Sequence, residues 1–306
     1  MNQASHAIFL ALCTVLCVCR VDAQDQKPVG PVSDRFGEFW YQGKAEITSY
    51  DLEQARYNDT HTGHAVLIFV TEDFSKSKQV KLDDPDRVPE DRLPVLKLNL
   101  TNKFNTGIYP YSIMTSVFTP LDRKKHKKTV KVSTSVQEWC GHTFVQLNFK
   151  EDAYSVQQNS YFERRGDQTL SIPGVTLEDE IWNTIRLNPE DLPLGEVEMI
   201  PGTIFQRLGS SPWRAQTAST TLEAADGNPG QMVYSIHYAE TDRTLDIRFN
   251  KAFPHEIESW EDTYPASRWR GGKMTTRAVR KKRMWLDYWS RNGVDDLALR
   301  HELELE

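Results

Sequence analysis

Residues 43–74 read GKAEITSYDLEQARYNDTHTGHAVLIFVTEDF and indicate how the whole chain folds. Apolar and polar side chains alternate in residues 43–57 and 64–74, and both runs are rich in β-branched and aromatic residues. A period of two is typical of strands with one buried face. Because residues 58–63 are turn-forming, the stretch predicts a β-hairpin.

The same pattern recurs along the chain, and the segments are joined mostly by loops of hairpin length. We predict further strands at residues 95–102, 108–118, 129–137, 143–150, 153–163, 195–200, 216–223, 232–237, 244–250, 255–261 and 273–288. Residues 81–94 carry three prolines and several acids, which predicts a longer exposed loop. A sheet with this many strands must curl, close into a barrel or split into two packed sheets.

Two helices stand out against this background. Residues 176–187 begin with Thr176 as an N-cap and place acidic residues in the first turn. Their apolar face is formed by Leu177, Ile181, Trp182 and Ile185. A shorter helix is predicted at residues 294–303. The predicted fold is mainly β: a strongly curved antiparallel sheet or half-barrel with one packed helix on its open side, in which residues 189–201 could join two halves. The alternating pattern of a doubly wound nucleotide-binding fold is missing.

The N-terminus has the pattern of an export signal. Residues 7–19 are apolar but too few to span a bilayer, and Val21 and Ala23 are small enough for cleavage before Gln24. We therefore predict a signal peptide over residues 1–23, a flexible leader at 24–35 and a β-rich domain at 36–306. The expected location is the periplasm or the outer envelope.

A lipid anchor is not expected, because Cys17 and Cys19 follow Leu16 and Val18 where a small residue is required. Cleavage would leave Cys140 as the only cysteine, so the mature chain could form no internal disulfide. A chain this long can be stable without one. The remaining apolar stretches are short, so no transmembrane span is expected in the mature chain. The formal net charge of −6 argues against nucleic acid as a partner.

Four segments resemble a family of exported bacterial envelope proteins of unknown function. They are residues 37–57 (GEFWYQGKAEITSYDLEQARY), 95–120 (VLKLNLTNKFNTGIYPYSIMTSVFTP), 130–148 (VKVSTSVQEWCGHTFVQLN) and 177–202 (LEDEIWNTIRLNPEDLPLGEVEMIPG). The resemblance implies no established activity. Some members carry the label "septum formation inhibitor Maf", but residues 210–214 (SSPWR) lack the paired arginines of the Maf loop, so no Maf residue is carried over. In its predicted architecture the chain is also similar to curved-sheet periplasmic carriers of lipid or lipoprotein chains, a likeness of fold alone.

Residues 137–142 (QEWCGH) form the one segment where catalytic chemistry could concentrate. If they are a single strand, Cys140 and His142 point to the same face about 7 Å apart, and Glu138 could orient the imidazole. Such a pair can supply a thiolate nucleophile or metal ligands. Two simpler interpretations are that Cys140 is a packed core residue and that Gly141 marks a bulge or a turn.

A metal site would draw on His61, His64, Cys140, His142 or His237, but their spacing matches no known signature. His61 lies in the predicted turn and His64 directly after it, where solvated imidazoles are expected. The sequence also lacks metalloprotease, hydrolase, Walker and dinucleotide-binding motifs. We therefore predict no metal and no cofactor.

The chain contains two basic runs. Residues 123–128 (RKKHKK) predict a solvated hairpin tip. Residues 280–283 (RKKR) lie inside a predicted strand in the C-terminal region, where aromatic residues are also frequent, and indicate either a protected sheet edge or a patch for anionic head groups. Aromatic side chains in a curved sheet usually form core, yet an aromatic concavity rimmed by arginine would suit an amphipathic ligand. The candidate ligand-binding residues are Trp260, Trp269, Trp285, Trp289, Arg280 and Arg283.

Two functional hypotheses follow. The first is a non-enzymatic cell-envelope protein that binds an apolar or amphipathic ligand such as a lipid, or an envelope protein partner, on the concave face of its sheet. The alternative is a thiol- or metal-dependent enzyme centred on Cys140 and His142, with Glu138 as the orienting residue.

Overall fold

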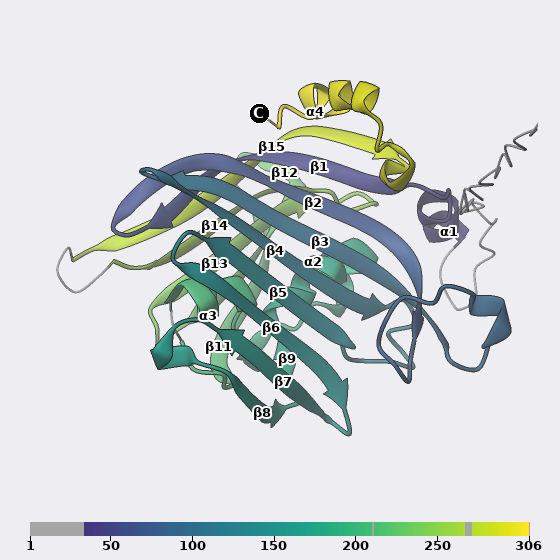
Figure 1. Cartoon of the computed structure of the whole chain (residues 1–306), viewed down its shortest axis with the longest axis horizontal. Helices are drawn as coiled ribbons and strands as arrows, with labels where there is room; N and C mark the ends of the chain where they lie inside the picture. Colours follow the sequence, from purple (N-terminus) through teal and green to yellow (C-terminus); the bar gives the residue numbers. More distant parts are fainter. Residues whose placement is uncertain (1–33, 210, 267–270, 306) are drawn as a thin grey trace, which may run out of the picture.

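The computed structural model describes residues 34–209, 211–266 and 271–305. The predicted signal peptide and nearly all of the predicted leader therefore lie outside the described residues. A single sheet of 15 strands dominates the fold and curves strongly (Figure 1). The prediction of a mainly β, strongly curved antiparallel sheet is thus confirmed.

The strands follow one another in a simple spatial order, β8-β7-β6-β5-β4-β3-β2-β1-β15-β14-β13-β12-β11-β10-β9. Neighbouring strands are antiparallel except β9 and β10, which are parallel. The strands are β1 (Ala45–Arg56), β2 (Asp59–Ser75), β3 (Arg92–Thr106), β4 (Tyr109–Pro120), β5 (Lys131–Glu138), β6 (Gly141–Lys150), β7 (Ala153–Ser160), β8 (Gln168–Pro173), β9 (Thr176–Leu177), β10 (Gly195–Ile200), β11 (Gln216–Ala225), β12 (Asn228–Tyr238), β13 (Arg243–Asn250), β14 (Ile257–Pro265) and β15 (Lys273–Leu286).

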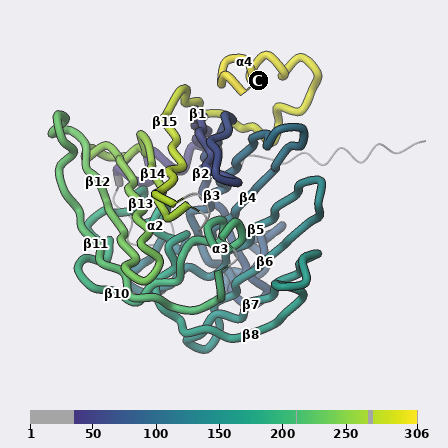
Figure 2. Tube along the Cα trace, turned by 90° about the vertical axis from the view of Figure 1, so that its left-hand side faces the viewer, coloured from purple at the N-terminus to yellow at the C-terminus, as the bar shows by residue number. Residues whose placement is uncertain are grey.

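The sheet has two halves, β1 to β8 and β9 to β15, which are joined at two places. The first and last strands, β1 and β15, pair along their length and join the halves in the middle of the sheet. At the opposite side only Gly174 and Val175 separate the two edge strands, β8 and β9. The halves therefore face each other with helix α2 (Glu178–Leu187) between them, as the end-on trace shows (Figure 2).

The hairpin of β1 and β2 is tighter than predicted. Tyr57 and Asn58 both have positive φ, 53° and 65°, as the central residues of a two-residue type I′ turn require. His61 consequently lies in β2 and not in a turn, which corrects the prediction, and His64 lies in β2 as the predicted strand 64–74 requires. Gly63 is needed at its position because a Cβ atom there would lie 2.1 Å from the backbone oxygen of Lys103 in β3.

The predicted packed helix is present as α2 (Glu178–Leu187), with Leu177 and not Thr176 at the N-cap. It lies inside the curved sheet, between the two halves (Figure 2). The other helices are α1 (Asp34–Trp40), α3 (Thr203–Gly209) and α4 (Ala298–Glu302), with short 3-10 turns at Pro85–Arg87, Glu163–Arg165, Pro189–Asp191, Tyr288–Ser290 and Val294–Leu297. None of the helices in the described ranges is long and apolar enough to cross a membrane.

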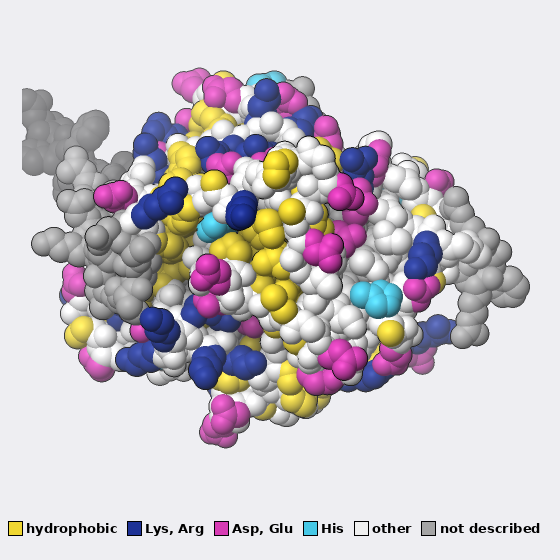
Figure 3. Space-filling model, turned by 180° about the vertical axis from the view of Figure 1, so that it is seen from behind, with side chains coloured by type: hydrophobic (Ala, Val, Ile, Leu, Met, Phe, Trp, Pro, Cys, Tyr) yellow, Lys and Arg dark blue, Asp and Glu magenta, His cyan; other side chains and the backbone are white. Residues whose placement is uncertain are grey.

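The C-terminal segment covers part of the outer face of the sheet. Leu303 and Leu305 pack there against Ala45, Ile47 and Val66 of β1 and β2. The rear face of the molecule mixes acidic and basic side chains around a group of hydrophobic ones (Figure 3). The main core lies inside the curve, where α2 is buried on nearly every side.

Candidate functional site

Buried ion pairs fix α2 to both halves of the sheet. Near its N-terminal end, Glu178 accepts two hydrogen bonds from Arg243 of β13, at 2.6 and 2.8 Å. At the other end, Nη2 of Arg186 donates to Glu46 of β1 at 2.8 Å, and both side chains are 1% exposed. Charges withdrawn from water are tolerated only when they are paired in this way. The two ion pairs therefore fix the position and orientation of α2 between the halves of the sheet.

Arg243 also bonds a second carboxylate. Its Nε donates to Oδ1 of Asp262 on β14 at 2.7 Å. Burial lowers the pKa of Arg243, but Asp262 and Glu178 more than offset this effect, so the pKa lies well above its ordinary value. Burial raises the pKa of Asp262, which Arg243 opposes. The side chain of Arg243 is fully committed to these two acids.

Asp179 connects α2 to α3. Its carboxylate accepts hydrogen bonds from the backbone N of Thr203 at 3.0 Å and from the Thr203 hydroxyl at 3.0 Å. The same hydroxyl contacts Thr134, which in turn contacts Thr115. Burial, and then the neighbouring charge of Glu178, raise the pKa of Asp179 to about 7.

This raised pKa predicts that Asp179 makes folding depend on pH. Because the ionised form is disfavoured in the folded state, its stabilising contribution is complete below the unfolded value of 3.8 and is lost as the pH rises towards about 7. Asp179→Asn cannot ionise. Its free energy of unfolding, measured by urea denaturation, should gain on that of the wild type by up to about 1.4 kcal/mol per pH unit between pH 4 and 7. A difference that does not change with pH would contradict the burial of this charge.

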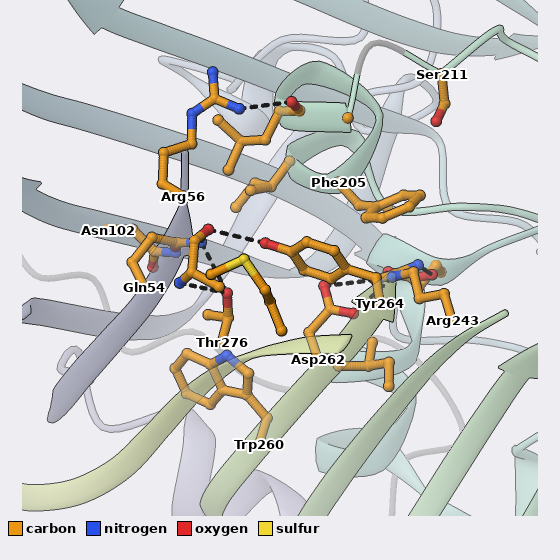
Figure 4. A pocket seen from close by; sticks show the side chains of 18 of the residues that line it. Gln54, Arg56, Asn102, Phe205, Ser211, Arg243, Trp260, Asp262, Tyr264 and Thr276 are labelled. Atoms are coloured by element: carbon orange, nitrogen blue, oxygen red, sulfur yellow. Dashed lines mark hydrogen bonds and ion pairs between the residues drawn. The ribbon is translucent and has the colours of Figure 1, made fainter. Parts of the chain in front are cut away.

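A cavity of about 870 Å³ lies between the two halves of the sheet, beside α2 and α3. This volume is within the range of pockets that hold small organic ligands. Its wall combines apolar and aromatic side chains with polar and charged ones, among them Arg243 and Asp262, as the close-up shows (Figure 4). The apolar lining residues include Leu98, Leu100, Val117, Trp182, Ile204, Phe205, Leu208, Trp260, Tyr264 and Met274.

Two buried amide side chains give this cavity unused hydrogen-bond acceptors. Gln54 is 3% exposed, and its Nε2 donates to Thr276 at 2.9 Å and to the Ala55 carbonyl at 3.1 Å (Figure 4). These acceptors fix the orientation of the amide, and Oε1 has no partner among the described residues. Asn102 is 4% exposed, and its Oδ1 is likewise without a partner within the described ranges. An unsatisfied buried carbonyl costs about 1–3 kcal/mol, so a donor in the cavity would stabilise both.

A second cavity of about 370 Å³ adjoins the first. Arg56, Tyr57 and Ser211 line both cavities, so the two meet at these residues. Nη1 of Arg56 donates to the carbonyl of Leu208 in α3 at 2.7 Å (Figure 4). Beyond this junction the lining includes the charged side chains of Arg164, Arg165 and Arg207.

The structure keeps Glu138 beside Cys140 but places His142 apart from them. Cys140 is exposed in the two-residue turn between β5 and β6, which corrects the interpretation of a packed core thiol and confirms a turn at this point. Glu138 is buried, accepts a hydrogen bond from the backbone N of Cys140 at 2.6 Å and raises the pKa of the thiol. His142 lines a separate, shallow depression. The cluster therefore lacks the lowered thiol pKa that a thiolate nucleophile needs.

The exposure of Cys140 predicts its reactivity. A thiol reagent should label the native protein at pH 8.5 at a rate within about tenfold of that in urea, because no packing has to open. Cys140→Ser should leave the thermal midpoint unchanged. Labelling that occurs only after unfolding would show that this thiol is protected.

Among the aromatic candidates that the structure describes, only Trp260 is placed at the larger cavity. It is buried, and its ring lies 5.2 Å from that of Trp182 in an edge-to-face arrangement. Trp285 packs instead against Phe39, with ring centroids 4.6 Å apart, and Trp289 is exposed on the surface. Trp269 lies outside the described residues.

The basic run 280–283 does not guard an edge, because β15 lies between β1 and β14. A β-bulge opposite Ser49 also breaks its alternation, so that Arg280 and Arg283 both pair with Glu256. Neither arginine lines either of the two cavities described above. Within the described residues, no group of three or more His, Cys, Asp or Glu side chains could hold a metal ion.

The polar groups at the two cavities were not singled out by the sequence analysis. Gln54 had a usable signal, because it shares the buried face of β1 with Tyr50 and Leu52. Arg56 and Arg207 had none. They are far apart in the sequence, and α3, which carries Arg207, is too short to show a periodic pattern.

Comparisons with known proteins give little beyond these observations. No family model and no curated protein matches the chain. A solved β-barrel-like protein with the domain of unknown function DUF1849, from Brucella abortus, is 10% identical, with a TM-score of 0.38, over 80% of this chain and 98% of that one. The immune modulator A of Aeromonas veronii is 7% identical, with a TM-score of 0.16, over 85% of this chain and 97% of that one. Similarities this low carry no argument about function.

Proposed function

We propose that this chain binds an amphipathic small molecule in the cavity between α2, α3 and the two halves of the sheet. The observation that carries the proposal is the combination of an apolar, aromatic wall with the unpartnered carbonyl oxygens of Gln54 and Asn102. The wall suits an apolar chain, and the oxygens suit a hydroxyl or amide N–H of the same ligand.

The position of α2 favours a small ligand over a protein partner on the concave face. The helix fills the middle of the curved sheet and is held there by Glu46 and Arg243. What remains is a space of about 870 Å³, the size of a small-molecule pocket. The proposal also requires no chemistry from Cys140, which is consistent with its raised thiol pKa.

A dye-binding assay tests the proposal. N-Phenyl-1-naphthylamine, a neutral apolar probe, should show a saturable rise in fluorescence with about one site per chain, and 1-hexadecanol should displace it. The hydrocarbon hexadecane has no donor for Gln54 or Asn102 and should compete at least several-fold less well. Absence of saturable dye binding would exclude the proposed function.

We further propose that the protein works outside the cytoplasm, in the periplasm or outer envelope, without a lipid anchor. The support is the apolar run at residues 7–19 followed by small residues at Val21 and Ala23, together with the resemblance to exported envelope proteins. N-terminal sequencing of protein recovered from bacterial cells should begin at or close to Gln24. A mature chain that retains Met1, or that starts at an acylated cysteine, would contradict this.

A further inference from the structure

Two arginine side chains that line the second cavity each have one nitrogen without a hydrogen-bond partner among the described residues. These nitrogens are Nε of Arg56 and Nη2 of Arg207, and both are buried. The remaining groups of each guanidinium hold it in place. Arg56 donates to Leu208 and to the Tyr111 hydroxyl at 3.3 Å, and Nε of Arg207 donates to Thr143 at 2.8 Å.

The charge of the Arg56 guanidinium acts on Arg207. Burial, and then the positive charge of Arg56, lower the pKa of Arg207. Both groups lie over aromatic rings, Arg56 at 4.3 Å from the ring centre of Tyr57 and Arg207 at 4.6 Å from that of Phe162. Two like charges held together in a partly buried site are stabilised when an anion binds between them.

The acids of this cavity compensate the pair only in part. The nearest carboxylate oxygen, Oε1 of Glu138, lies 3.9 Å from Nη2 of Arg207, which is too far for a hydrogen bond. Its other oxygen is occupied by the backbone N of Cys140. Arg164 and Arg165 also line the cavity, so it holds four arginines against the two acids Glu138 and Glu163.

We propose that Arg56 and Arg207 bind the anionic head group, a carboxylate or a phosphate, of the amphipathic ligand whose apolar chain occupies the larger cavity. This inference rests on the proposed function. The geometry supports it because Arg56 and Tyr57 line both cavities, so the arginines adjoin the cavity that holds the apolar wall. The planar guanidinium matches both kinds of head group, since each offers two oxygens to parallel N–H donors.

The test compares ligands that have the same 16-carbon chain but differ in the charge of the head group. Hexadecanoate, hexadecyl phosphate and 1-hexadecanol are titrated by displacement of N-phenyl-1-naphthylamine at low and at moderate salt. In the wild type at least one of the two anions should bind about tenfold or more tightly than the alcohol, and salt should weaken this preference. The stronger of the two identifies the head group as carboxylate or phosphate.

Arg207→Gln should remove the preference for the anion and leave the affinity for 1-hexadecanol unchanged. Arg214→Gln is the matched control, because Arg214 is half-exposed, pairs with Glu240 and lines neither cavity, and it should keep the preference. If Arg207→Gln does not fold, Arg207→Lys, which keeps the charge but loses the planar fork, should weaken anion binding alone.

The outcomes separate the two proposals. Equal affinity of wild-type protein for the alcohol and both anions, or an anion preference that survives in Arg207→Gln, would overturn the role of the arginines while leaving the ligand cavity intact. Failure of the dye and of all three ligands to bind would overturn the cavity itself.

Discussion

Replacing Arg186 with methionine is expected to lower the free energy of unfolding by about 3–5 kcal/mol. Arg186 is 1% exposed, bonds Glu46 through two nitrogens and donates to the Pro254 carbonyl at 2.9 Å. Methionine fills much of the same space but removes the hydrogen-bonded partner of the buried Glu46 carboxylate, which keeps the longer ion pair with Arg283 at 3.8 Å. Desolvation of that charge is the main cost.

The double variant Glu46→Gln, Arg186→Met separates charge from packing. With both charges removed, a large part of the lost stability should return, because replacing both members of a buried ion pair is often nearly neutral. The matched control is Lys273→Met, whose ion pair with Asp242 is about half exposed and should change stability by no more than about 1 kcal/mol. Urea denaturation of all four proteins measures these differences. A cost for Arg186→Met equal to that of Lys273→Met would show that α2 is not anchored by this pair.

Filling the larger cavity is expected to reduce ligand affinity by on the order of 10–100-fold. Ile204 on α3 lines this cavity and is only half-buried, so Ile204→Trp can place an indole in the space that the ligand needs without overpacking the core. The affinity for N-phenyl-1-naphthylamine should fall accordingly, while circular dichroism stays that of the wild type.

The control for this variant is Leu194→Trp. Leu194 is 58% exposed and lies outside the lining of both cavities, so the same substitution type there should leave dye binding unchanged. If Ile204→Trp folds normally and binds the dye as the wild type does, the ligand site must lie elsewhere on the molecule.

The sequence predicts the strands well because burial in this fold follows a period of two. In β5 the residues Val132, Thr134, Val136 and Glu138 are buried and the residues between them are more exposed. The same pattern carried the prediction of β3, β4 and β6. It missed β8, which alternates but has only six residues, and β9, which has two. It also gave no warning of the bulge in β15, which puts Arg280 and Arg283 on the same side.

The site was less predictable than the fold, because it depends on contacts between distant residues. The apolar face of α2 is readable from Ile181 and Ile185, but its charged residues are buried as well, which no amphipathic pattern predicts. Their partners lie 140 residues away, in the case of Glu46, and 65 away, in the case of Arg243. The residue type of Cys140 favoured a buried position in the prediction, whereas the two-residue turn places this residue at the surface.

The central claim, that the larger cavity holds an amphipathic ligand, is tested most directly by native mass spectrometry. Wild-type, Ile204→Trp and Leu194→Trp proteins are each incubated with a total lipid extract of bacterial envelopes, separated from free lipid and weighed intact. The account predicts one additional mass per chain, within the range of a single amphiphile, in the wild type and in Leu194→Trp, and its loss in Ile204→Trp. Wild-type protein that carries no added mass, or an added mass that is the same in all three proteins, would contradict it.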